Sequence, residues 1–150
     1  MDPAPRPFSE LPRDPELGVP VPFACGTAGF GGPRDGSAPS VRELDGRRVT
    51  QCALSRVCGV CGAGLGRPIA FLGSRIEVDR NAFHFPPAHV VCAERLVAAY
   101  SGTGDAVLGQ SEPVEWRVVT TSGFEYVRPG REDVDRRPTF EPNSLLGNPA

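Results

Sequence analysis

The stretch RVCGVCGAGLG (residues 56–66) places two cysteines two residues apart, with a glycine after each of them. A two-residue spacer lets both thiolates of such a pair reach one metal ion, and the glycines permit the tight backbone reversal of a zinc knuckle. The same spacing occurs in redox dithiols and in disulfide frameworks. Residues further along the chain have to decide between these interpretations.

A second pair, His89 and Cys92, lies in the stretch FPPAHVVCAERL (85–96). The spacing of apolar residues predicts a helix over about 88–100, which the preceding prolines suit as an entry and Gly102 as a stop. Residues three apart share one face of a helix, so this pair can converge on the ion held by the first. The sequence therefore predicts a zinc site with the ligands Cys58, Cys61, His89 and Cys92.

Four protein ligands close a zinc site, whereas catalytic zinc usually keeps a position for water. We therefore expect a structural Zn²⁺, which stabilises a small module by on the order of 10 kcal/mol. Redox chemistry is disfavoured because the segment GAGLGRP after the first cysteine pair is a poor helix former. If His89 or Cys92 did not bind, the open position would favour a catalytic metal instead.

The segment PIAFLGSRIEVDR (68–80) has an apolar run, a Gly73-Ser74 turn and then alternating apolar residues, which predicts a β-hairpin. Knuckle, hairpin and ligand-bearing helix form the layout of a treble-clef zinc site. A further hairpin is predicted near the C-terminus, with strands over 114–120 and 124–128. The expected fold is a small α+β, treble-clef-like domain.

The remainder of the chain divides by composition. Residues 1–24 form a proline-rich arm, read either as a disordered tail or as an extended arm docked in an apolar groove. Residues 25–51 form a glycine-rich loop with a short helix, for which Ser40 and Glu43 have the spacing of a capping box and which Gly46 interrupts. Residues 52–128 form the zinc-binding core, and 129–150 a tail anchored by Phe140 and the pair Leu145-Leu146.

Composition makes several kinds of partner unfavourable. All 16 basic residues are arginine, and the net charge of −2 makes non-specific DNA binding unfavourable. The stretch GTAGFGG lacks the Gly-Lys-Ser/Thr ending of a phosphate loop, so no nucleotide cofactor is expected. With no signal-like start and no long apolar run, the expected location is cytoplasmic or virion-associated, away from a membrane.

Other candidate residues have a structural and a functional interpretation. His84 is expected to face solvent, with a role as a substitute zinc ligand or catalytic base as the alternative. Cys25 and Cys52 are expected to be buried core residues rather than nucleophiles. The aromatic residues of the last third are expected to pack a hairpin face or to form a binding surface with the apolar residues of the arm, namely Trp116, Phe124, Tyr126, Val19, Val21 and Phe23.

The chain resembles a group of small, uncharacterised zinc-knuckle proteins of actinobacteria and their phages. The resemblance rests on LPRDPELGVPVPF (11–23), RVCGVCGAGLGRPIAFLG (56–73) and FPPAHVVCAERL (85–96), with a weaker echo in EWRVVTTSGFEYVR (115–128). It covers about half of the chain. Its specific elements, Cys-x2-Cys-Gly and Pro-Pro-x-His-x2-Cys-Ala, fall on the four expected ligands. The resemblance implies a zinc site and no established activity.

The functional expectation is a non-catalytic, zinc-stabilised binding module that docks onto a larger protein assembly, of phage or mobile-element type. The first alternative is a nucleic-acid-binding or transcription-related zinc module, which needs its arginines gathered on one face. The second is a small enzyme that uses Cys25 and His84 or an open zinc position. The balance is against an enzyme, because the motifs of zinc deaminases and of treble-clef nucleases are missing.

Overall fold

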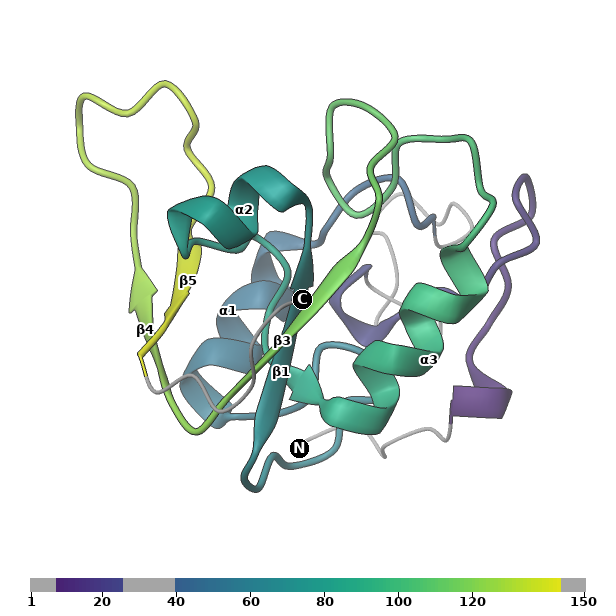
Figure 1. Ribbon diagram of the computed structural model, residues 1–150, viewed down its shortest axis with the longest axis horizontal. Coiled ribbons are helices and arrows are strands. Elements are labelled where there is room, and N and C mark those ends of the chain that lie inside the picture. The colour runs from purple at the N-terminus through teal and green to yellow at the C-terminus, as the bar shows by residue number, and fades with distance from the viewer. Residues whose placement is uncertain (1–7, 26–39, 144–150) are drawn as a thin grey trace.

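Strand β1 (Ile69–Gly73) lies at the centre of the molecule, and all of its residues are buried. The computed structural model describes residues 8–25 and 40–143 (Figure 1). In these ranges the fold is mixed α+β. The other strands are β2 (Ala88–His89), β3 (Arg117–Thr121), β4 (Phe124–Val127) and β5 (Thr139–Pro142), and the helices are α1 (Gly46–Ser55), α2 (Arg75–Arg80), α3 (Val90–Tyr100) and the 3-10 turns η1 (Phe8–Glu10) and η2 (Phe23–Cys25).

The strands form two small antiparallel sheets. In the first, the strand order is β2-β1-β3, and Phe71 of β1 lies opposite Val119 of β3. In the second, β4 pairs with β5, so that Tyr126 lies opposite Phe140. The isolated bridge between Phe83 and Phe140 brings the segment after α2 to this second sheet.

The alternation of side chains along β1 divides the core into two clusters. Ala70 and Leu72 point into a cluster with α3 and the N-terminal segment. Ile69 and Phe71 point to the other side, into a cluster with Phe83, Phe140, Val49 and Val119. Since successive strand residues face opposite sides, a continuous apolar run is what a strand buried on both faces requires.

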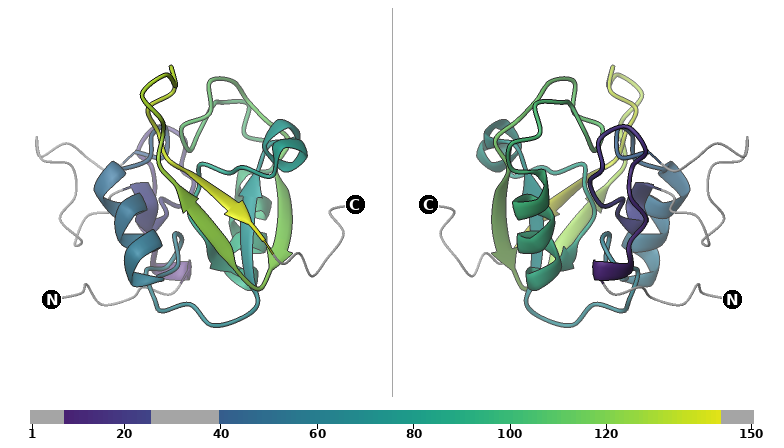
Figure 2. Two further views of the ribbon diagram at one scale, coloured as in Figure 1. Left: turned by 90° about the vertical axis from the view of Figure 1, so that its left-hand side faces the viewer. Right: turned by 90° about the vertical axis from the view of Figure 1, so that its right-hand side faces the viewer.

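Two helices cover the sheets on different sides (Figures 1 and 2). Helix α3 packs against β1 and β3, while α1 contacts η2. The predicted helix over 88–100 is confirmed by α3 apart from its first two residues, which form β2. The short helix was predicted too early: α1 begins at Gly46, because Asp45 accepts hydrogen bonds from the amides of Arg47 and Arg48.

The predicted hairpin over 68–80 is wrong in its second half. Residues 75–80 form helix α2, because Ser74 caps it and Glu77 completes a capping box. Ile76 and Val78 alternate with polar residues as in a strand, but so short a pattern is also compatible with a helix of fewer than two turns. The second strand beside β1 comes from β3 instead.

The predicted C-terminal hairpin is also wrong in its pairing. Its two strands exist as β3 and β4, but they belong to different sheets and do not pair with each other. The Thr121 side chain donates to the Gly123 carbonyl at 2.8 Å and accepts from the Gly123 amide at 3.3 Å, which fixes a bend between the sheets.

Both flanking segments contribute to the core wherever they are described. Of the proline-rich arm, Leu11, Val21 and Phe23 are buried, and the hydroxyl of Tyr100 donates to the Pro20 carbonyl at 2.8 Å. This agrees with a docked arm rather than with a free tail. In the C-terminal segment Phe140 is fully buried as expected, but it belongs to a strand, β5, and not to a tail. Leu145 and Leu146 lie outside the described residues.

Candidate metal centre

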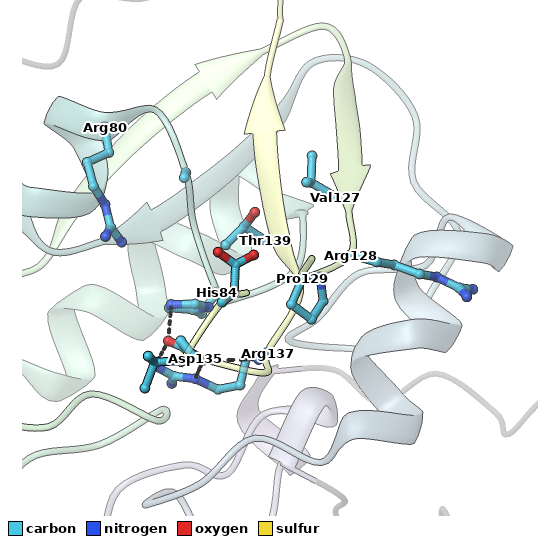
Figure 3. Close-up of a pocket in the computed structure, with 11 residues that line it drawn as sticks. Arg80, His84, Val127, Arg128, Pro129, Asp135, Arg137 and Thr139 are labelled. Carbon is cyan, nitrogen blue, oxygen red and sulfur yellow. Dashed lines mark hydrogen bonds and ion pairs between the residues drawn. The ribbon is translucent and has the colours of Figure 1, made fainter. Parts of the chain in front are cut away.

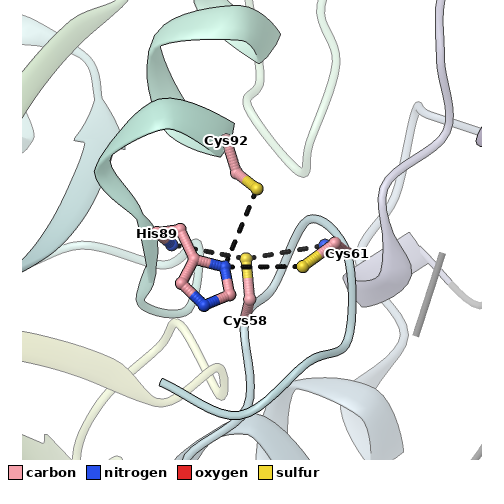
Figure 4. Close-up of side chains that lie close together, drawn as sticks. All are labelled: Cys58, Cys61, His89 and Cys92. Atoms are coloured by element: carbon pink, nitrogen blue, oxygen red, sulfur yellow. Dashed lines mark hydrogen bonds between the residues drawn. The ribbon is translucent and has the colours of Figure 1, made fainter. Parts of the chain in front are cut away.

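Four side chains converge at the N-terminal end of α3 (Figure 4). They are the sequence-predicted residues Cys58, Cys61, His89 and Cys92, and their ligand atoms all lie within 4.8 Å of one another. The two cysteines of the first pair come from the turn that follows α1, His89 from the end of β2, and Cys92 from the first turn of α3. The cluster can therefore hold a metal ion.

The first cysteine pair lies in a tight turn that depends on its glycines. The Gly62 amide donates to the Cys58 carbonyl at 2.9 Å, and Gly62 has a φ of 79°, which a residue with a side chain adopts only with strain. A Cβ on Gly59 would lie 2.7 Å from the Pro86 side chain and 3.0 Å from the Phe85 ring. The segment before β2 therefore packs directly on the backbone of this turn.

Three backbone amides point at the sulfur of Cys58. The amides of Val60, Cys61 and His89 donate to it at 3.3, 3.5 and 3.4 Å. Burial raises the pKa of the Cys58 thiol, but hydrogen bonds from the Cys61 and Cys92 thiols and from the amides outweigh burial and hold that pKa well below its usual value. Cys58 is thus prepared as an anionic ligand.

The ring of His89 is oriented for metal binding by a carbonyl. Its Nε2 lies 2.9 Å from the Gly64 carbonyl oxygen, which can only accept, so this nitrogen carries the proton. The unprotonated Nδ1 then faces the cluster, 3.4 Å from the Cys61 sulfur and 3.8 Å from that of Cys92. An outer hydrogen bond that fixes the tautomer is typical of metal-binding histidines.

Cys92 has the opposite electrostatics to Cys58. Hydrogen bonds from its thiol to Cys58 and Cys61, together with burial, raise the pKa of Cys92 strongly. Three thiols in one cluster cannot all ionise next to one another without a compensating positive charge. A divalent cation supplies that charge, since thiolate ligands bind in their deprotonated form. The donor set of three thiols and one correctly oriented imidazole therefore fits a metal ion.

The exposure of the ligands shows how the cluster is enclosed. Cys58 is fully buried, whereas Cys61, His89 and Cys92 are half-buried. Hydrogen bonds tie the cysteine turn to its surroundings on two sides: the Gly59 amide donates to the Pro87 carbonyl at 2.8 Å, and the Phe23 amide to the Val60 carbonyl at 2.9 Å. A bound metal would hold the arm, the turn and α3 in one unit.

The two remaining cysteines are core residues, as predicted. Cys25 is 6% exposed and Cys52 is fully buried. Burial raises the pKa of both thiols above the usual value, with nearby acidic groups adding to this for Cys25 and the thiol of Cys58 for Cys52. Neither thiol is prepared to act as a nucleophile at neutral pH.

His84 was expected to face solvent, and this is wrong. It is 8% exposed, its Nδ1 lies 3.2 Å from the Pro138 carbonyl, and its Nε2 lies 3.5 Å from the carboxylate of Asp135. Asp135 in turn binds Arg137 through both oxygens, and these hydrogen bonds hold the pKa of Asp135 well below its usual value. Partners some fifty residues further along the chain bury the histidine.

The aromatic and apolar binding candidates pack mainly inside the protein. Val21 and Phe23 are buried and Val19 is half-buried. The ring of Trp116 lies 6.5 Å from that of Tyr100, while Phe124 and Tyr126 lie 5.6 and 5.3 Å from Phe140. These contacts correspond to the packing interpretation, although Phe124 and Tyr126 pack against β5 rather than against a hairpin partner.

Two buried carboxylates were missed. Asp14 accepts hydrogen bonds from the amides of Glu16, Leu17 and Val41 at 2.8, 2.9 and 3.0 Å. Glu77 accepts from the amides of Ser74 and His84 and from the side chain of Gln110 at 3.0, 2.9 and 2.7 Å. The Ser74-x-x-Glu77 spacing is a capping-box signature that identifies the second of these from the sequence.

Among the helices of the described ranges, none has the length and apolarity to cross a membrane. Comparison of the chain with protein-family models, with curated proteins and with solved structures finds no match.

Proposed function

We propose that this protein is a non-catalytic binding module whose fold is stabilised by a structural zinc ion and which docks onto a larger protein assembly. The observation that carries the proposal is the closed Cys₃His cluster. Its four ligand atoms lie within 4.8 Å of one another. If all four bind one zinc ion, they fill the tetrahedral set of a structural site and leave no position for a substrate or for water. The role of the metal is then architectural, and the function lies on the surface that the metal stabilises.

Zinc is the metal that this donor set favours. Three thiolates and one imidazole are the ligands of many structural zinc sites, and softer ligands of this kind disfavour Mg²⁺ and Ca²⁺. A cysteine turn that provides two ligands and a helix start that provides the others resembles a treble clef. In our proposal β1 and α2 stand where a treble clef has its hairpin.

The other candidate catalytic groups support a non-catalytic role. Both ring nitrogens of His84 are engaged, one by the Pro138 carbonyl and the other by Asp135, so neither is free to accept a proton from a substrate. Within the described ranges no hydrogen bond joins Cys25 to His84. A nucleophile-and-base pair built from these two residues is therefore not supported.

The docking element that we propose is the segment between β4 and β5, residues 128–138, named here the β4–β5 loop. It projects from the body of the molecule in Figures 1 and 2. Val134 in this loop is 99% exposed and is flanked by acidic residues. Val134 therefore has no role in the core, and our proposal places it in contact with the partner.

A nucleic-acid module is the second candidate, and the arginines disfavour it. Of the residues that would have to form its surface, Arg48 lies over the Phe23 ring at 4.6 Å, Arg56 over the Phe124 ring at 5.2 Å, and Arg75 is within 3.9 Å of Asp79. Cations committed to rings and to a carboxylate within the protein are less available to phosphates.

The test combines metal analysis with site-specific crosslinking in the native host. We expect one zinc per chain by elemental analysis of the purified protein. A photo-crosslinking residue at position 134, introduced as Val134→p-benzoylphenylalanine, should give one discrete protein adduct. The same change at Val91, which is 56% exposed on α3, serves as the control and should give none.

Metal content below half a zinc per chain would refute the structural zinc. Equal adducts from positions 134 and 91, or none from either, would refute docking through the β4–β5 loop. The resemblance noted above makes a phage particle or a mobile-element complex the first assembly to examine.

A further inference from the structure

A surface cavity of about 500 Å³ lies between α1, the end of β4 and the β4–β5 loop. It is distinct from the metal cluster and shares no residue with it. Its volume is within the range of small-molecule sites. The lining residues are Gly46, Thr50, Tyr126, Arg128, Pro129, Arg136 and Pro138.

No carboxylate lines this cavity, although acidic residues outnumber basic ones in the chain. Arg128 makes no hydrogen bond or ion pair with any other residue in the described part of the chain. Figure 3 shows its side chain extending away from His84 and towards α1. Its charge is therefore available to a ligand.

Arg136 is held in place without being neutralised. Its Nη1 donates to the backbone carbonyls of Gly130 and Asp133. Carbonyl acceptors orient a guanidinium, but they do not cancel its charge as a carboxylate does. An oriented guanidinium loses little further side-chain entropy when it binds a planar or tetrahedral oxyanion.

The acidic residues of the same loop are engaged elsewhere. The Asp133 carboxylate accepts from the Gly130 amide at 2.7 Å, and the Asp135 carboxylate binds Arg137 and faces His84. Both aspartates line the neighbouring cavity beside His84 instead. Arg128 lines both cavities, whereas Arg136 lines only the one beside α1. In the described part of the chain neither arginine forms an ion pair with the two aspartates, whose carboxylates are bound as above.

Two hydroxyl groups add a polar strip to the cavity wall. The Thr50 hydroxyl donates to the Gly46 carbonyl at 2.9 Å, so the hydrogen between Thr50 and Tyr126, whose oxygens lie 3.3 Å apart, belongs to Tyr126. This phenolic hydrogen can turn towards a ligand oxygen at the cost of one neutral hydrogen bond. The rings of Pro129, Pro138 and Tyr126 supply an apolar wall beside it.

We propose that this cavity binds a small organic phosphate monoester, with Arg128 and Arg136 holding the phosphoryl group and the proline and tyrosine rings contacting the organic part. Arginine pairs suit phosphoryl oxygens because the planar guanidinium donates two parallel hydrogen bonds. A monoester carries close to two negative charges at neutral pH, which matches the two cations.

A nucleic acid fits the site less well, because a strand needs a row of cations along its backbone and this cavity offers two. The cavity also ends against α1, where Asp45 caps the helix and presents a negative charge outside the lining. An occupant of limited length is therefore favoured over a continuous strand.

The test is a titration of the full-length, metal-loaded protein with phenyl phosphate at pH 7.5, monitored by the NMR signals of the backbone amides. We expect saturable shifts at Gly46, Thr50 and Tyr126 with a Kd at or below about 1 mM. Arg128→Gln should weaken binding about tenfold or more, which corresponds to one charge-assisted contact. Arg131→Gln is the matched control, because Arg131 lies on the same loop but does not line the cavity, and it should change the Kd less than twofold.

Phenol, the neutral counterpart of the probe, should give no shifts at these positions. Equal weakening by Arg128→Gln and Arg131→Gln would show that the loop attracts anions only through its general charge, and would overturn the proposal. Absence of saturation up to 10 mM phenyl phosphate would overturn it as well. The proposal would also be overturned if a single-stranded oligonucleotide shifted the same amide signals with a lower Kd than phenyl phosphate.

Discussion

The Phe23 amide donates to the Val60 carbonyl at 2.9 Å, which joins the proline-rich arm to the middle of the cysteine turn. The next pair along, the Ala24 amide and the Gly59 carbonyl, is separated by the same 2.9 Å. We therefore expect the state of the metal cluster to affect the position of the arm, and this coupling can be measured.

Loss of one ligand should release both the metal and the arm. Cys58→Ser removes the sulfur to which three amides donate. Under the proposed structural zinc, we expect less than one tenth of the wild-type zinc content. Most of the metal-dependent stabilisation, on the order of 10 kcal/mol, should be lost with it. Limited proteolysis should then cut within residues 8–25, a segment that should stay protected in the wild-type protein. Cys52→Ala, a fully buried cysteine outside the cluster, should retain its zinc; equal zinc loss in both variants would contradict the ligand assignment.

The two glycines of the cysteine turn offer a matched pair. Gly59→Ala places a Cβ 2.7 Å from Pro86, and the free energy of unfolding should fall by about 1–3 kcal/mol through overpacking. A Cβ on Gly64 meets nothing within 4 Å, so Gly64→Ala should change stability by less than about 0.5 kcal/mol. Urea unfolding of both zinc-loaded variants measures the difference. Similar stability of the two would mean that Pro86 does not pack on the turn.

Asp14 should make stability depend on pH in the acidic range. Burial raises its pKa, but hydrogen bonds from the amides of Val41, Leu17 and Glu16 outweigh burial and lower the pKa below its usual value. A carboxyl with a depressed folded-state pKa stabilises the fold above its unfolded pKa, near 4, and this contribution disappears as the pH falls through the folded-state value.

Asp14→Asn tests this contribution. The variant should be about 1–3 kcal/mol less stable than wild type at pH 6. The reason is that the side-chain NH₂ group of Asn replaces one carboxylate oxygen that accepts a backbone hydrogen bond. The difference between the two proteins should shrink as the pH falls below 4. Protonation of the metal ligands affects both proteins alike and cancels in the comparison. A difference that stays constant from pH 6 to pH 3 would show that the carboxylate charge contributes nothing.

Glu77 should matter for the fold more than its place on a six-residue helix indicates. In Glu77→Gln the new side-chain NH₂ group faces one of the three groups that donate to Glu77 in the wild type, so one hydrogen bond is lost. We therefore expect the free energy of unfolding to fall by about 1–3 kcal/mol. Glu94→Gln, on an exposed position of α3, should be close to neutral. Thermal unfolding of both variants measures this, and equal melting temperatures would contradict a supporting role for Glu77.

Local patterns in the sequence predicted those features that depend on near neighbours. The apolar run of β1, the helical spacing of α3, the burial of Cys25 and Cys52 and the convergence of two ligand pairs all follow from spacing and composition. Features that depend on distant partners were not predictable in this way. His84 is buried by Asp135 and Pro138. Strands β3 and β4 belong to different sheets because β3 pairs with β1 and β4 pairs with β5.

The helix α2 shows a different limit. Its capping box at Ser74 and Glu77 was visible in the sequence, yet the alternation of Ile76 and Val78 favoured a strand. Over six residues a period of 2 and a period of 3.6 are difficult to distinguish. The hydrogen bonds of Glu77 to His84 and Gln110, which no local pattern reveals, support the helical choice.

The two-sided burial of β1 has a consequence for any attempt to excise the metal centre. Val21 belongs to the cluster on one face of the strand, and Phe140, 5.9 Å from Phe71 between ring centres, to the cluster on the other. Residues 52–128 alone would leave both faces uncovered. A zinc finger can be moved to another protein as an independent unit. The cysteine and histidine ligands of this protein cannot, because the core that packs behind them includes residues from both ends of the chain.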